Sequence, residues 1–186
     1  CYGFHIPSFP LHIYYPKQYK NKKDYSTWEY ILLNINHYTF YFITNMIQLK
    51  DIVTIQTGVY IKPSPNSETL YLQLSDFDKD GNFIDRIVTY VSIPEKNNKH
   101  LLSSKDLLFA AKGNKNICII APETNKTCVA SPSFIVIRIK DKEKILPEYV
   151  AWYLNSPIIQ NLLANHALGS AIKSITKNVL EDLEIP

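Results

Sequence analysis

Residues 128–169 read CVASPSFIVIRIKDKEKILPEYVAWYLNSPIIQNLLANHALG and contain the clearest strand and helix patterns of the chain. The stretch Phe134–Ile139 is strongly β-branched, which predicts a strand. Pro147 suits the first turn of a helix, and Pro157 predicts a break or kink in that helix. Its apolar residues recur at helical spacing until Gly169 closes it: Val150, Leu154, Ile158, Leu162 and Leu163.

Short strands separated by turn-forming residues dominate the preceding sequence. A short helix is expected over residues 47–58, closed by Gly58 at a position that favours positive φ. Strands are expected at 69–75, 82–93, 105–113 and 116–122, the first two forming a hairpin around the turn DFDKDG, with polar loops at 62–67, 94–100 and 123–127. Residues 170–186 predict a short strand, a short helix led by Thr176 and an extended exit. The pattern indicates an α+β fold, with a mostly antiparallel or mixed sheet and helices at the ends.

The composition is that of an ordinary globular protein. Of 186 residues, 46% are hydrophobic and 20% are charged, which excludes a wholly disordered chain and predicts one domain with or without an extension. The three cysteines, Cys1, Cys118 and Cys128, form neither a disulfide framework nor a CxxC zinc motif. The sequence has no apolar run of membrane-spanning length and no signal-peptide pattern, so we expect a cytoplasmic protein without a membrane partner.

The first 45 residues differ in composition from the rest of the chain. They hold 13 of the 23 aromatic residues, show no clean helix or strand period, and precede the only methionine, Met46. One hypothesis is that Met46 is the true start and that residues 1–45 are not native. The alternatives are an aromatic arm that packs on the domain, or the tail of a preceding domain. We therefore divide the chain into an aromatic-rich extension, 1–45, and a domain, 46–186.

The turn at residues 76–81 matches the first half of a calcium-binding EF-hand loop through Asp76, Asp78 and Asp80. Such a loop needs a bidentate carboxylate at its twelfth position, where this sequence has Ile87. The flanking residues also predict strands rather than helices. We therefore interpret the motif as a hairpin turn and expect no metal site.

Motifs of known catalytic sites are missing from the sequence. It contains no GxSxG, P-loop, GxGxxG or HExxH pattern. Cys118 lies in an apolar stretch, where a free Cys is usually a buried hydrophobe, whereas Cys128 lies beside a polar loop and is expected to be more exposed. A Cys or Ser nucleophile paired in space with His100 or His166 stays open as an alternative.

Positive charge is concentrated in loops between residues 96 and 126. Lys and Arg number 20 against 17 acidic residues, a net charge of +3 that alone decides nothing about a nucleic-acid partner. Within this stretch, only Asp106 and Glu123 oppose the lysines, which are Lys96, Lys99, Lys105, Lys112, Lys115 and Lys126. Lys binds phosphate and the accompanying Asn residues can read an adenine edge, so the loops predict a DNA contact surface. Ordinary solvated loops are the simpler interpretation.

Three stretches resemble a known family in their order and spacing. KDLLFAAKGNKN at 105–116 resembles the "gDll…g" core of target-recognition domains from type I restriction–modification specificity subunits. The stretch at 146–186, with YLNS, a Gly turn and a final IP, resembles the end of such a domain. IQLKDIVTIQTGVYIKPSPN at 47–66 resembles its opening. The resemblance spans residues 46–186.

The resemblance implies an α+β domain that reads one half of a split DNA target and performs no chemistry. In such systems a methyltransferase subunit methylates adenine with S-adenosylmethionine, and a restriction subunit using ATP and Mg²⁺ cleaves unmethylated DNA. This chain is then expected to need no cofactor, and its partners are double-stranded DNA and those two subunits. By their position in loops, the expected DNA-contacting residues are Lys62, Lys99, His100, Lys112, Asn114, Lys115, Asn116, Asn125, Lys126 and Lys173.

The sequence departs from the family pattern at both ends. A full specificity subunit has two recognition domains joined by long helices, whereas this sequence stops at EIP, where such a helix would begin. Residues 1–45 match nothing in the family. Three functions therefore stay open: one arm of a specificity subunit, the recognition domain of a single-chain type II restriction–methylation enzyme, or an inactive interaction or cassette fragment.

Overall fold

The computed structural model describes residues 46–84, 89–112, 116–166 and 174–186, all within one unit, Met46–Pro186. The expectations for the extension 1–45, for the strand end at Gly113 and for the helix end at Gly169 lie outside the described residues. The division at Met46 therefore stays a prediction.

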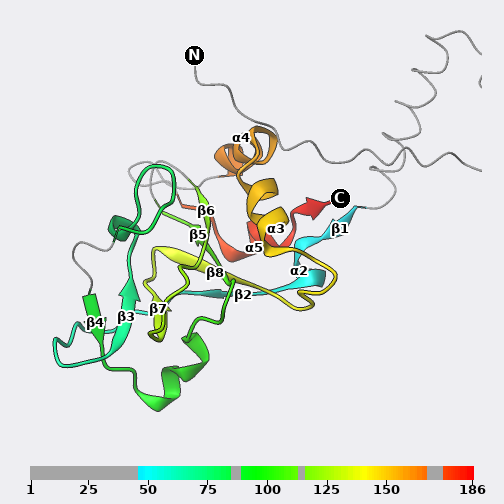
Figure 1. Cartoon of the computed structure of the whole chain (residues 1–186). Helices are drawn as coiled ribbons and strands as arrows, with labels where there is room; N and C mark the ends of the chain where they lie inside the picture. The colour runs from blue at the N-terminus through cyan, green and yellow to red at the C-terminus, as the bar shows by residue number, and fades with distance from the viewer. Residues whose placement is uncertain (1–45, 85–88, 113–115, 167–173) are drawn as a thin grey trace, which may run out of the picture. The chain divides into compact units, whose positions relative to one another are not determined.

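The central strand β8 (Phe134–Ile139) lies inside a four-stranded antiparallel sheet with the order β2-β8-β5-β6 (Figure 1). Its neighbours are β2 (Val53–Thr57) and β5 (Leu107–Ala110), and β6 (Cys118–Ile120) pairs with β5. All four residues of β5 are buried. Both faces of this strand are covered, which explains why its sequence, LLFA, is continuously apolar instead of alternating.

A three-stranded sheet has the order β4-β3-β7. Here β3 (Thr69–Leu72) pairs antiparallel with β4 (Thr89–Val91) and parallel with β7 (Cys128–Ala130). A further pair, β1 (Ile47–Gln48) with β9 (Glu184–Ile185), joins the two ends of the domain. The mixed pairing confirms the predicted fold class.

The described helices are short, and most of them lie near the chain ends or between strands. The α-helices are α2 (Leu49–Ile52), α3 (Pro147–Leu154), α4 (Pro157–His166) and α5 (Lys177–Glu181), and the 3-10 helices are η1 (Leu74–Asp76) and η2 (Glu95–His100). The expected break at Pro157 is confirmed, because α4 begins there. Asn155, between α3 and α4, uses its side-chain amide to bond both the N–H and the carbonyl of Cys118, at 2.8 and 2.7 Å. This pairing ties the helices to the edge strand β6.

The four-stranded sheet is covered by helices on one face and by the three-stranded sheet on the other. Alternate residues of each strand enter the two cores. In β5, Leu107 and Phe109 join Val150 and Leu154 in the helix-side core. Leu108 and Ala110 pack instead with residues of the second sheet, among them Leu70, Leu72 and Ala130. The outer face of the three-stranded sheet carries a third, smaller cluster around Tyr71.

Two of the sequence-based elements are wrong. Residues 47–58 do not form one helix, because only Leu49–Ile52 is helical and Val53–Thr57 is strand β2. In β2 the residues Val53 and Ile55 are buried while Thr54 is exposed, which is the alternation of a half-buried strand. Residues 94–100, expected to be an irregular loop, contain the η2 helix.

Gly58 has a different role from the one predicted. It does not close a helix, and Gly81 is the described glycine with positive φ, at 86°. A Cβ on Gly58 would lie 2.0 Å from the carbonyl oxygen of Ser131 and 2.6 Å from that of Ala130. The glycine is therefore required because backbone from the end of β7 passes directly over it.

Candidate nucleic-acid interface

Lys112 and Asn116, the described residues of the first predicted basic loop, precede β6, whereas the second loop, residues 123–127, follows it. Extended chain rises about 3.3 Å per residue, so Asn116 and Glu123 are separated by roughly 20 Å along β6 and its flanks. The described residues therefore present two candidate surfaces, one at each end of β6.

One of the two surfaces lies where β3, β5 and β7 begin and β4 ends. We call it the β3–β7 end and define it as residues 62, 95–105 and 122–127. Pro63 pairs with Val91 at the end of β4, and Leu101 pairs with Val129 beside β7. These pairings bring together chain segments that are distant in sequence, with η2 at their side (Figure 1). The surface carries the exposed side chains of Lys62, Lys96, Lys99, Lys105, Asn125 and Lys126.

Lys126 is held in place against an aromatic ring. Its Nζ donates a hydrogen bond to the Tyr90 hydroxyl at 2.6 Å and lies 4.7 Å from the centroid of the ring. The Lys126 N–H donates to Thr124 Oγ1 at 3.1 Å, which closes a tight turn. Thr69 and Thr127 are joined at the adjacent strand starts by a 3.0 Å bond between their hydroxyls. A cation positioned in this way loses little conformational freedom when it meets an anion.

A groove of about 360 Å³ runs between the segments 102–105 and 121–128. Lysines flank it, and its polar lining comes from Ser103, Ser104, Lys105, Glu123, Thr124 and Lys126. Lys105 Nζ lies 2.9 Å from Glu148 Oε1, and this hydrogen bond raises the pKa of Lys105. Hydroxyl, carboxylate and ammonium groups therefore face one concave surface, which suits a polar, anionic ligand.

The turn that precedes β5 explains part of the family motif. The N–H of Asp106 donates to the carbonyl of Ser103 at 3.1 Å, and the Asp106 carboxylate accepts the Ser103 N–H at 2.8 Å. Lys105, the third residue of this turn, has φ of 60°, a region that favours glycine. Lys105 stands where the resembled motif, gDll, has its glycine. This chain thus keeps the left-handed turn with a strained lysine.

We expect Lys105→Gly to be more stable than Lys105→Ala. Both variants lose the ammonium group and its pairing with Glu148, but only glycine relieves the backbone strain at φ of 60°. The melting temperature of the glycine variant should exceed that of the alanine variant by a few degrees in thermal unfolding followed by circular dichroism. Equal melting temperatures would show that the turn relaxes without strain.

Asp106 and Arg138 hold the backbone of this end. The Asp106 side chain is fully buried, and Arg138 donates to it from Nη2 at 2.7 Å and from Nε at 3.0 Å. The same Nη2 donates to the carbonyl of Leu101 at 2.9 Å. The hydrogen bonds to Asp106 raise the pKa of Arg138. The pair therefore connects β8 to the segment that carries the lysines.

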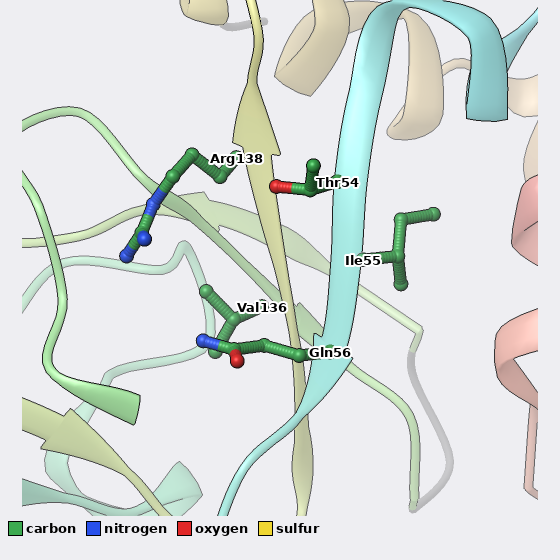
Figure 2. Close-up of a pocket in the computed structure, with 5 residues that line it drawn as sticks. All are labelled: Thr54, Ile55, Gln56, Val136 and Arg138. Atoms are coloured by element: carbon green, nitrogen blue, oxygen red, sulfur yellow. The ribbon is translucent and has the colours of Figure 1, made fainter. Parts of the chain in front are cut away.

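A small pocket of about 150 Å³ is lined by Thr54, Ile55, Gln56, Val136 and Arg138. Figure 2 shows Thr54, Gln56 and Arg138 projecting from the same side of β2 and β8, while Ile55 points to the other side. Gln56 Nε2 donates to the carbonyl of Lys99 at 3.2 Å. The pocket thus contains groups that anchor the end of η2. Gln56 and Arg138 were not predicted from the sequence. Arg138 could have been identified there, because it is a charged residue inside an otherwise apolar strand.

The structure places the described contact residues in two groups. Lys62, Lys99, Asn125 and Lys126 are exposed together at the β3–β7 end, where His100 is half-buried and its Nδ1 is buried without a hydrogen-bond partner. Lys112 is exposed at the other end of β6 and pairs with Ser174. Beside it, Asn116 is half-buried and donates its side-chain amide to the Ala110 carbonyl at 3.0 Å. Outside the described residues lie Asn114, Lys115 and Lys173. The DNA-contacting role of all these residues stays a prediction.

The cysteines of the domain are both buried. Cys118 is 3% exposed and Cys128 is 7% exposed, so Cys128 is the more exposed of the two, as expected, although both side chains are buried. Burial raises the pKa of both thiols, which disfavours the reactive thiolate. Cys128 Sγ contacts the Thr124 hydroxyl and the Lys126 carbonyl, each at 3.6 Å. These environments are those of structural cysteines.

The aspartates of the EF-hand-like turn bind the backbone of the turn itself. Asp76 accepts the Gln73 N–H at 2.7 Å, and Asp78 accepts the N–H groups of Asp80 and Asn82 at 2.9 and 2.8 Å. The interpretation as a hairpin turn is confirmed by the bridge between Phe77 and Phe83. In the part of the chain that the structure describes, three or more metal-ligating side chains do not cluster anywhere.

These features define a mixed α+β domain with a basic, loop-built surface at one end. The family model for the type I restriction modification DNA specificity domain matches residues 44–186, and the chain belongs to this family. The resemblance found in the sequence is thereby confirmed. A search of curated proteins gave no matching relative. Among the described residues, helices with the length and apolar character needed to cross a bilayer are absent.

Two solved structures are similar to this chain, and the first of them shares its fold. The HsdS subunit from Thermoanaerobacter tengcongensis matches with a TM-score of 0.51 and 16% identity, over 76% of this chain and 32% of that one. The type I restriction–modification S subunit from M. genitalium matches with a TM-score of 0.47 and 14% identity, over 75% of this chain and 33% of that one. The chain thus corresponds to about a third of each subunit.

Proposed function

We propose that this chain recognises one half-site of a split DNA target as the specificity component of a type I restriction–modification system. Family membership supports DNA recognition as the general role. The observation that carries the proposal is the gathering of exposed lysines around a polar groove at the β3–β7 end. Lysines there bind phosphates and supply affinity, while loop side chains contact base edges and supply specificity.

The chemistry of the system belongs to partner subunits in this proposal. A methyltransferase subunit carrying S-adenosylmethionine methylates adenine at the site chosen by this domain, and a restriction subunit that uses ATP and Mg²⁺ cleaves unmethylated DNA. The domain itself performs no chemistry. The buried thiols of Cys118 and Cys128 agree with this non-catalytic role.

We expect the full chain to bind duplex DNA weakly and with strong salt dependence. The lysines of the β3–β7 end displace counterions from the phosphates, so log K should fall linearly with log salt concentration, by about 0.9 per phosphate contacted. Fluorescence anisotropy with a labelled duplex over about 50 to 200 mM KCl measures the slope. A protein that is folded by circular dichroism but binds no duplex at low salt would refute the proposal.

A pair of variants identifies which end of the domain binds DNA. Lys99→Ala/Lys126→Ala should weaken binding to every duplex sequence alike and reduce the salt slope by roughly 2, about 1 for each lysine that no longer binds a phosphate. Lys112→Ala is the comparison variant for the other candidate surface, because Lys112 is an exposed lysine at the opposite end of β6. If Lys112→Ala weakens binding and the double variant does not, the DNA surface lies around Lys112 and Asn116 instead.

A further inference from the structure

Glu123 is an unusual group at the β3–β7 end, because it places a carboxylate inside the basic groove. It lines the groove together with Lys105 and Lys126, and its side chain is exposed. Both lysines are held by other groups: Lys105 pairs with Glu148 at 2.9 Å, and Lys126 bonds the Tyr90 hydroxyl at 2.6 Å. Within the described ranges, the Glu123 carboxylate forms neither an ion pair within 4.0 Å nor a hydrogen bond, although its charge adds to the effect of Glu148 in raising the pKa of Lys105.

An open carboxylate on a phosphate-binding surface weakens binding unless it meets a hydrogen-bond donor. Phosphate and sugar oxygens repel it, and base edges offer it acceptors and amino donors. In the major groove the base donors are the exocyclic amino groups of cytosine N4 and adenine N6. Ser103 and Ser104, which line the same groove, can donate or accept hydrogen bonds beside such a base.

Resting on the proposed function, we infer that Glu123 is a specificity-determining residue that accepts a hydrogen bond from the exocyclic amino group of a cytosine or adenine in the major groove. Lys105 and Lys126, which line the same groove, bind neighbouring phosphates and bring this base over the groove. The acidic side chain then rejects guanine and thymine, whose O6 and O4 atoms at that position are acceptors.

Selection from a random duplex library tests this inference with the full chain and with Glu123→Gln. The unaltered protein should enrich one position in cytosine or adenine. Glu123→Gln, whose amide can donate as well as accept, should lose roughly tenfold or more of the preference at that position and keep the preference elsewhere. Glu95→Gln is the matched control, because Glu95 is exposed at the same end but lies outside the groove lining. Its selected sequence should be unchanged.

Base analogues that lack the amino group provide an independent measurement. Purine in place of the selected adenine, or pyrimidin-2-one in place of the selected cytosine, should weaken binding of the unaltered protein and leave binding of Glu123→Gln nearly unchanged. The inference is overturned if Glu123→Gln strengthens binding to all sequences equally and keeps the selected site. Inosine lacks the minor-groove amino group of guanosine. If replacing guanosine by inosine abolishes a preference that depends on Glu123, then Glu123 contacts the minor groove, and the inference is overturned. If the unaltered protein binds no duplex at all, the proposed function fails, and this inference fails with it.

Discussion

Asp106→Ala should lower the free energy of unfolding by about 3 kcal/mol, the largest loss we expect from a single side chain. The carboxylate is completely buried and accepts hydrogen bonds from Arg138 Nη2 at 2.7 Å and from the Ser103 N–H at 2.8 Å. Removing it leaves a partly buried guanidinium and a backbone donor without their partner. Chemical denaturation followed by circular dichroism measures the loss.

Two comparisons isolate the ion pair from the general cost of substitution. Asp182→Ala removes an exposed carboxylate that pairs with Lys50 at 3.5 Å, and it should leave the denaturation curve nearly unchanged. The double variant Arg138→Met/Asp106→Ala lacks both charges. Its loss of unfolding free energy should therefore be smaller than the sum of the losses in Arg138→Met and Asp106→Ala. An Asp106→Ala curve that coincides with the Asp182→Ala curve would contradict the predicted role of the pair.

Gly58→Ala should lower the free energy of unfolding by about 2–3 kcal/mol. The new methyl group would lie 2.0 Å from the Ser131 carbonyl oxygen, which is backbone and cannot rotate away as a side chain does. The end of β2 and the end of β7 would have to separate, and that movement breaks the hydrogen bond from the Val59 N–H to the Ala130 carbonyl, now 2.9 Å. The same denaturation experiment measures this loss.

Thr57→Ala is the control for Gly58→Ala. Thr57 is the exposed neighbour at the end of β2, so its truncation changes β-propensity without creating a clash. Its effect should stay within about 1 kcal/mol, the span of measured β-propensities. A Gly58→Ala variant that unfolds at the same denaturant concentration as Thr57→Ala would show that the two strand ends separate without cost.

The strands with the strongest local pattern were predictable because their residues are apolar without interruption. β5 and β8 each lie between two cores, so LLFA and FIVI needed no tertiary information to be identified as strands. Pro157 marked the break between α3 and α4 for an equally local reason, since proline cannot continue a helix. Residues 53–57 were misassigned because a short amphipathic stretch fits a helical and a strand period almost equally well, and pairing with β8 decides between them.

The candidate site was only partly predictable. Lysines in polar loops were visible in the sequence, and so was the acidic exception at Glu123. The sequence did not reveal that Lys112 and Asn116 lie at the opposite end of β6 from residues 123–127. It also did not indicate that the Asn116 amide is engaged with the Ala110 carbonyl at 3.0 Å, or that Gln56 supports the carbonyl of Lys99 at 3.2 Å.

By itself, the sequence determined the family, the α+β class and the central strands, because these depend on local apolar patterns and on the order of short motifs. The tertiary structure decided which loops share a surface and which charged side chains are fixed by ion pairs or hydrogen bonds. It also decided that position 58 must be glycine. Those properties depend on strand pairing between segments that are distant in the chain, such as β3 with β7 and Asp106 with Arg138. A local pattern contains no information on such pairing, because the free energy of a non-local contact exists only after the sheets have assembled.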